Sequence, residues 1–206
     1  MVTAEPVGRR ERKKAATRAA IAAAAAALFL ERRFDDVTVR EIADAADVSP
    51  TTVFAHFPQK EALVFHQEQQ QHERLVAAVR DRPPGTSLSA ALREHFRSEL
   101  RELESGPDAA GGRRLLALID ETPALQGYAS QMWLRRERVL ADAIAGEFGL
   151  PQPSEEIRVY ARFVLQIQLL ASATPDPAAT LEAGFAILGA GWDRYEQQRQ
   201  PVRPLA

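Results

Sequence analysis

The sequence predicts an all-α protein of about nine helices, and three observations support this class. Apolar residues recur at the three- and four-residue spacing of one helix face in several successive segments. Helix-start signals, such as Thr38 with Glu41 and Ser49 with Pro50, precede two of these segments. No segment shows the alternating pattern of a strand, and no internal repeat is visible.

Length and composition are those of a globular protein: 206 residues, of which 46% are hydrophobic and 26% charged. No apolar run approaches the ~20 residues that a membrane-spanning helix needs, and the N-terminus lacks a signal-peptide pattern. The absence of cysteine excludes disulfides, thiolate chemistry and Cys-type zinc sites. We therefore expect a cytoplasmic protein with no membrane contact.

The N-terminal region carries a local basic arm. Residues 1–8 are expected to be disordered, and a first helix is expected to run to about Glu31. Six Lys or Arg stand between Arg9 and Arg18 against the single Glu11, although the net charge of the whole chain is −2. Such an arm suits a protein that touches DNA with one end; a solvated, frayed terminus is the alternative.

Two short helices follow the first. Thr38 and Glu41 have the spacing of a capping box, so a helix is predicted to begin at Val39. Ser49 as N-cap and Pro50 at the first helical position predict the next helix. The following proline ends that helix after about two turns.

A helix this short must be held by packing, which we assign to Val53 and Phe57. The residues left to face outward are Thr51, Thr52, Ala55 and His56. A short, rigidly seated helix with small polar side chains is what reading of the DNA major groove requires. An ordinary helical hairpin inside an all-α core is the alternative.

The segment from Thr38 to Leu63 resembles the DNA-binding signature of the tetracycline-repressor (TetR) family. Besides Thr17, Arg18 and Phe29 upstream, the matching residues are Thr38, Val39, Glu41, Ile42, Ala43, Ala46, Val48, Ser49, Thr52, Val53, Phe54, His56, Phe57, Lys60, Glu61 and Leu63. The resemblance covers about the first quarter of the chain. The family usually has Gly where Arg33 and Asp47 stand, and Tyr where Phe54 stands.

The resemblance implies which residues meet DNA. Thr38 and Lys60 each lie at the start of a helix, where the dipole favours a phosphate. Thr51 and Ala55 are expected to face bases. Phe54 has no hydroxyl to donate, so His56 is expected to take more of the phosphate contact. The full predicted DNA-binding set is Arg9, Arg10, Lys13, Lys14, Thr38, Ser49, Pro50, Thr51, Thr52, Phe54, Ala55, His56 and Lys60.

A helix expected from near Lys60 to about Arg80 has almost no apolar residue between Phe65 and Leu75. Such a polar helix suits a bridge between two domains. We therefore predict a helix-turn-helix DNA-binding domain over residues 1–65 and a larger ligand-binding and dimerisation domain over residues 66–206. Within the latter, helices are expected over residues 88–103, 115–119, 123–148 and 154–172, and from 177 onward, with a loop over 105–112.

The helix over residues 154–172 has apolar residues on every side and is expected to be buried all round. The last helix has the a/d spacing of a seam between paired helices. The predicted dimer interface is Ile157, Tyr160, Val164, Leu181, Phe185, Leu188 and Trp192. Apolar residues of this domain are core by default, but the resemblance implies a ligand cavity among them. Its predicted lining is His95, Phe96, Glu99, Ile119, Tyr128, Met132, Trp133, Phe163, Gln166 and Ile167.

The four histidines have no metal-ligand spacing, and no catalytic or nucleotide-binding motif is present, so we predict neither an enzyme nor a metal or cofactor site. The resemblance implies a homodimeric repressor that leaves operator DNA when it binds a small molecule. The residues from Phe54 to Glu61 resemble those of regulators that bind acyl-type or other lipophilic ligands, so the resemblance implies a lipophilic effector. Two alternatives remain: a DNA-binding protein without an effector, regulated by a partner protein or architectural, and a helical enzyme whose hairpin mimics the motif.

Overall fold

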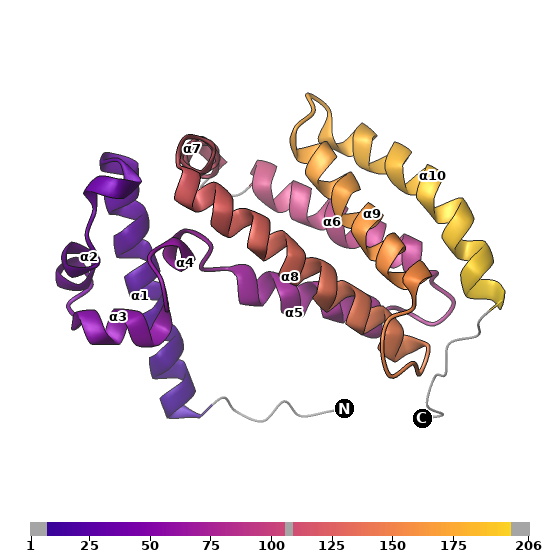
Figure 1. Cartoon of the computed structure of the whole chain (residues 1–206), viewed down its shortest axis with the longest axis horizontal. Coiled ribbons are helices and arrows are strands. Elements are labelled where there is room, and N and C mark those ends of the chain that lie inside the picture. The colour runs from indigo at the N-terminus through magenta and orange to yellow at the C-terminus, as the bar shows by residue number, and fades with distance from the viewer. Residues whose placement is uncertain (1–7, 106–108, 199–206) are drawn as a thin grey trace. The chain divides into compact units, whose positions relative to one another are not determined.

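The computed structural model describes residues 8–105 and 109–198, in which it has ten α-helices, one short 3-10 helix and no strand (Figure 1). The predicted all-α class is confirmed. In this described part of the chain, no helix is long and apolar enough to cross a membrane. Contacts group the chain into two compact units. The first unit runs through His66 and includes Ala110–Tyr128, and the second unit contains Gln67–Ala109 and the chain from Ala129 onward.

The first unit is built on α1 (Arg9–Glu31), which ends where predicted and buries one alanine-rich face. Alanine favours the helix and lets neighbouring helices approach closely. The core of this unit combines α1 with the 3-10 helix η1 (Phe34–Asp36) and helices α2 to α4. Its buried members include Ile21, Ala25, Phe29, Phe34, Val37, Ile42, Val53, Phe57 and Leu63.

The predicted caps of α2 (Val39–Ala45) and α3 (Pro50–His56) are both present. Thr38 and Glu41 form a reciprocal capping box, and the Ser49 hydroxyl accepts from the backbone N–H of Thr52 at 3.1 Å. Between the helices, the N–H of Val48 donates to the carbonyl of Ala43 at 3.0 Å, which closes a Schellman turn. Asp47 in this turn has a φ of +52°, the left-handed region where glycine is favoured.

The predicted single helix over residues 60–80 was wrong: the chain forms α4 (Glu61–Val64) and then α5 (Glu68–Arg80), with turn residues between them. Two contacts account for the break. The ring of Phe65 stacks on Tyr128 with centroids 5.0 Å apart, and the carbonyl of His66 accepts from Arg18 Nη2 at 3.2 Å. The arginine therefore takes the carbonyl that a continuous helix would have used.

Helix α7 (Ala109–Glu121) begins earlier than the predicted 115–119, so the predicted loop over 105–112 was too long. It groups with the first unit, together with the first residues of α8 (Pro123–Glu147). Leu125 is buried in the core of that unit, and Leu115, Leu118, Ile119 and Tyr128 pack against it. Residues 110–128 therefore group with the first unit, whereas the predicted division placed them in the domain over residues 66–206.

The second unit packs α5, α6 (Leu88–Ser105) and the rest of α8 with α9 (Glu155–Ser172) and α10 (Pro177–Gln198). Helix α10 lies against both α9 and α6. A Cβ at Gly184 would sit 2.6 Å from Ile167 Cγ2, so the glycine allows α10 to approach α9 closely. The expectation that α9 is buried all round was wrong, because Val159, Phe163, Leu169 and Leu170 are 42–59% exposed.

Candidate functional site

One side of helix α3 packs into the core of the first unit, and the other side is exposed. Val53 and the following Phe57 are each 1% exposed and anchor the helix in the core of the first unit. Thr51, Phe54 and Ala55 are exposed on its other side. The arrangement matches the docking requirement of a recognition helix, which is a rigid seat and a free outward face.

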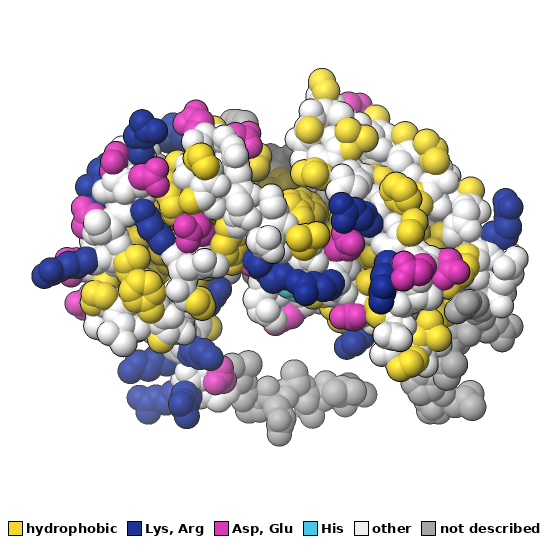
Figure 2. Space-filling model, viewed as in Figure 1, with side chains coloured by type: hydrophobic (Ala, Val, Ile, Leu, Met, Phe, Trp, Pro, Cys, Tyr) yellow, Lys and Arg dark blue, Asp and Glu magenta, His cyan; other side chains and the backbone are white. Residues whose placement is uncertain are grey.

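Basic side chains gather at the start of α1 in the same unit. Arg9, Arg10, Lys13 and Lys14 are all exposed there, and Figure 2 shows their end of the helix as a dark blue group. A cluster of cations of this kind supplies the sequence-independent attraction to phosphates.

Other predicted DNA-binding residues are already engaged within the first unit. The Thr38 hydroxyl and N–H both donate to Glu41 Oε2 at 2.8 Å. The Thr38 backbone N–H, its hydroxyl and Arg32 hold the pKa of Glu41 at about 2. The Thr52 hydroxyl lies 2.8 Å from the Ser49 hydroxyl.

Lys60 precedes α4 and reaches inward. Its Nζ donates to the carbonyl of Phe34 and lies 4.2 Å from the centre of the Phe34 ring. An ammonium has three donors, so a phosphate contact by Lys60 stays a prediction. His56 is partly buried at the end of α3; burial, then the charges of Arg18 and Lys14, lower its pKa. A lowered pKa favours the neutral imidazole in the free protein.

Arg18, which the sequence analysis counted in the basic arm and in the family signature, makes structural contacts that were not predicted. Its guanidinium donates to the carbonyls of His56 and His66 and lies 4.1 Å from the centre of the Phe57 ring. One side chain therefore joins α1 to the end of α3 and to the turn after α4. The signal was available, because Arg18 stands three residues before Ile21 in the buried stripe of α1.

The predicted ligand-lining residues are divided between the two units. Ile119 and Tyr128 pack on the core of the first unit, while Phe163 and Gln166 are exposed on α9. Phe96 lies in the core of the second unit, against which Trp133 and Ile167 pack, and Met132 is partly buried. His95 and Glu99 belong to a buried polar cluster of that unit. Sequence reasoning missed its other members, Arg136 and Gln168, which show no apolar periodicity that could reveal them.

The predicted dimer interface lies inside one protomer. Ile157, Tyr160, Val164, Leu181, Phe185 and Trp192 are at most 5% exposed, and Leu188 packs against the same core. These residues form the seam that α10 makes with α9 and α6 of its own chain. The large apolar residues exposed on α9 and α10 are Val159, Phe163, Leu169, Leu170 and Ile187, of which Ile187 is 81% exposed. Figure 2 shows hydrophobic side chains exposed along both helices.

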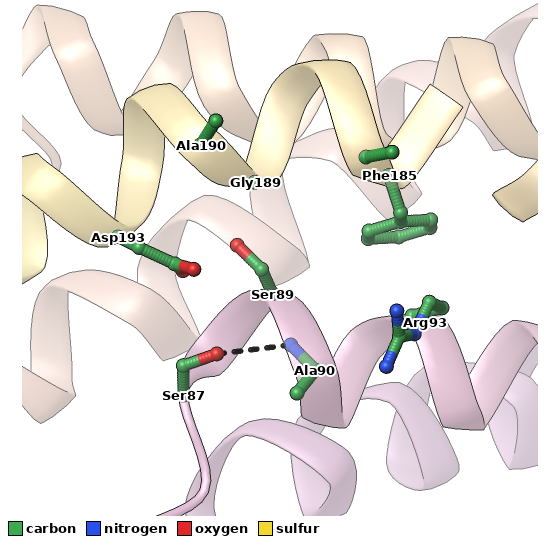
Figure 3. A pocket seen from close by; sticks show the side chains of 9 residues that line it. Ser87, Ser89, Ala90, Arg93, Phe185, Gly189, Ala190 and Asp193 are labelled. Atoms are coloured by element: carbon green, nitrogen blue, oxygen red, sulfur yellow. Dashed lines mark hydrogen bonds between the residues drawn. The ribbon is translucent and has the colours of Figure 1, made fainter. Parts of the chain in front are cut away.

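A pocket of about 330 Å³ opens between α6 and α10 (Figure 3). Its walls are Ser87, Ser89, Ala90, Arg93, Phe185, Ala186, Gly189, Ala190 and Asp193. Asp193 and Ser89 point toward one another from the two helices. Among the predicted residues only Phe185 lines it, so this pocket is distinct from the predicted ligand site. The described residues hold no cluster of three acidic or histidine side chains suited to a metal ion.

Comparison with known proteins identifies the family. The family model described as bacterial regulatory proteins, tetR family, matches residues 21–66, and the model of the MftR C-terminal domain matches residues 86–193. The chain belongs to the TetR family. It is a transcriptional regulator of a family whose members are typically DNA-binding repressors with a ligand-binding domain.

Individual relatives are distant. The HTH-type transcriptional regulator TcmR of Streptomyces glaucescens is 31% identical over 147 residues, which are 69% of this chain and 65% of TcmR. The chain thus spans less than two thirds of that relative. MftR of Mycobacterium tuberculosis is 26% identical over 82% of this chain and 88% of its own. The structure of Salmonella enterica GusR superimposes with a TM-score of 0.57 at 22% identity, covering 84% of this chain and 94% of GusR.

Proposed function

We propose that this TetR-family regulator is a homodimeric repressor that binds operator DNA through α3 and the basic start of α1. A small, lipophilic effector bound by the second unit releases it. The observation that carries the proposal is the exposed face of α3, on which Thr51 and Ala55 stand above the buried anchor Val53. We propose that it acts in the cytoplasm. We also propose that its role is regulation rather than catalysis.

The exposed apolar side chains of α9 and α10 support a dimer. Val159 and Phe163 are more than half exposed on α9, and Ile187 is 81% exposed on α10. Large apolar side chains gathered on a surface mark an interaction site. A second copy that covers this surface would give the two recognition helices that a two-fold operator needs, with half-sites about one turn, or ~34 Å, apart.

Release by an effector requires that ligand and DNA favour different arrangements of the chain. Helix α8 is continuous from Pro123 to Glu147 and contributes residues to both units, whereas the chain from α4 to α5 is interrupted. We therefore propose α8 as the element that carries the effect of a ligand. A coupling of about 1–3 kcal/mol would lower operator affinity about 5- to 150-fold.

The test begins with an operator selected from random DNA and measures binding by fluorescence anisotropy at several salt concentrations. Replacement of Lys13 and Lys14 by alanine should reduce the salt slope by about 1.8, because each lost phosphate contact accounts for about 0.9. Replacement of the exposed Arg80 and Arg138 of the second unit, by alanine, is the matched control and should leave the slope unchanged. Equal slopes for both double variants would reject the proposed DNA surface.

A DNA-binding protein without a small-molecule effector is the remaining alternative. It predicts that operator affinity does not respond to any compound that co-purifies with the protein. Native mass spectrometry of the purified protein, followed by anisotropy with the recovered compound, separates the two functions.

A further inference from the structure

A buried polar cluster joins three helices in the second unit. Both carboxylate oxygens of Glu99, on α6, accept from Arg136 Nη2 of α8 at 3.1 Å. Gln168 of α9 donates to Glu99 Oε2 at 2.7 Å, and His95 Nε2 lies 3.4 Å from Glu99 Oε1. The Arg136 side chain is 5% exposed and that of Glu99 15%, so the cluster lies in the interior of the unit.

The charges of this cluster balance without a further ion. Burial is the largest influence on the pKa of Glu99 and raises it, but His95 and Arg136 together outweigh burial, so the net pKa is lowered. Glu99 is therefore a carboxylate beside a guanidinium. An anionic ligand would meet the negative charge of Glu99 and would have to compete with it for Arg136.

Two polar atoms of the cluster nevertheless lack a hydrogen-bond partner. Arg136 Nε and Gln168 Oε1 are both buried and unpaired. Native interiors leave few such atoms unpaired, and each one calls for an explanation. Arg136 Nε can only donate and Gln168 Oε1 can only accept, so a single group that served both atoms would have to accept and donate.

The surroundings of these atoms are aromatic and apolar. The Arg136 guanidinium lies 5.7 Å from the ring centres of both Phe96 and Trp133. Leu100 and Ile167 pack against the same core. A group that binds here is therefore attached to an apolar body.

We propose that the effector of this regulator is a neutral, hydrophobic compound with a hydroxyl group, and that the hydroxyl binds between Arg136 Nε and Gln168 Oε1. The two residues share Glu99 Oε2 as an acceptor, which keeps their unpaired atoms near the same carboxylate. A hydroxyl donates and accepts at once, whereas a hydrocarbon leaves both atoms unpaired. This inference rests on the proposed function, in which the second unit binds an effector.

The test is equilibrium dialysis of the full chain, without DNA, against three probes of one shape: 2-naphthol, 2-methylnaphthalene and 2-naphthoate. We expect 2-naphthol to bind at least tenfold more tightly than the other two. Gln168→Met should abolish this preference while the weaker binding of 2-methylnaphthalene is unchanged. Gln131→Met, at an exposed position of α8 in the same unit, is the matched control and should keep the preference.

Equal affinity for the three probes, or no measurable binding of 2-naphthol, would overturn the inference and leave ordered water as the partner of the unpaired atoms. A preference for 2-naphthol that survives Gln168→Met would also overturn the inference. A wild-type preference for 2-naphthol in a protein that fails to bind selected DNA would instead overturn the repressor function and support the hydroxyl site. The probe series on the wild type keeps the inference testable if Gln168→Met does not fold.

Discussion

Asp47 occupies a backbone conformation that costs an ordinary residue free energy. Its φ of +52° lies in the left-handed region, between α2 and α3. We predict that Asp47→Gly raises the free energy of unfolding by about 1 kcal/mol, because glycine enters this region without a Cβ clash. Urea unfolding measures the change. Asp47→Asn is the control, since it removes the charge and keeps the shape; an equal gain in both variants would assign the cost to the charge.

The sequence predicted individual residues well where their partners are local. Thr38 and Glu41, and Ser49 and Thr52, are three residues apart, so capping could be predicted from spacing. The partners of Arg18 and Lys60 are carbonyls 48 and 26 residues away, those of His66 and Phe34. No local pattern predicts such contacts, because the fold itself brings the atoms together.

At the scale of elements, the turn between α4 and α5 depends on Arg18. We predict that Arg18→Lys lowers the free energy of unfolding by about 1–2 kcal/mol, because an ammonium cannot bond two separate carbonyls and also cover the Phe57 ring. Urea unfolding tests this, with the exposed Arg12→Lys on the same helix as the matched control. A loss in the control as large as that in Arg18→Lys would show that the guanidinium contacts are not its source.

Helix existence was predictable for most of the chain, but helix breaks and helix faces were not. The segment 60–80 contains no Gly or Pro that would predict a break, and the Phe65–Tyr128 stack and the Arg18 bond lie where the helix is interrupted. The spacing of Leu181, Phe185 and Trp192 correctly marked an apolar seam. Spacing cannot say whether the partner helix belongs to the same chain or to another copy, and here it is the same chain.

At the scale of the whole molecule, the exposed apolar residues of α9 and α10 should set the oligomeric state. We predict that Ile187→Glu raises the dimer dissociation constant at least about 100-fold, because it would bury an unpaired charge between two copies. Sedimentation equilibrium measures it. Leu134→Glu, at a 44% exposed position of α8, is the control and should stay dimeric. An intact Ile187→Glu dimer would remove this position from the interface.

The all-α class and the family were predictable from the first quarter of the chain, because capping and turn signals there are local. The association of Ala110–Tyr128 with the first unit was not predictable, since a leucine such as Leu125 could pack in the core of either unit. Its place depends on contacts between segments about 60 to 100 residues apart, which no local pattern encodes.

The claim that α3 reads DNA through its outward face is tested most directly by fluorescence anisotropy of a selected operator with Ala55→Glu. Ala55 is exposed in the free protein, so the variant should keep the melting temperature of the wild type. A carboxylate in the groove would repel the phosphates, and we predict at least about 100-fold weaker binding. Ala178→Glu, at an exposed position of α10, should bind as the wild type does. Wild-type affinity of Ala55→Glu for the operator would contradict the account.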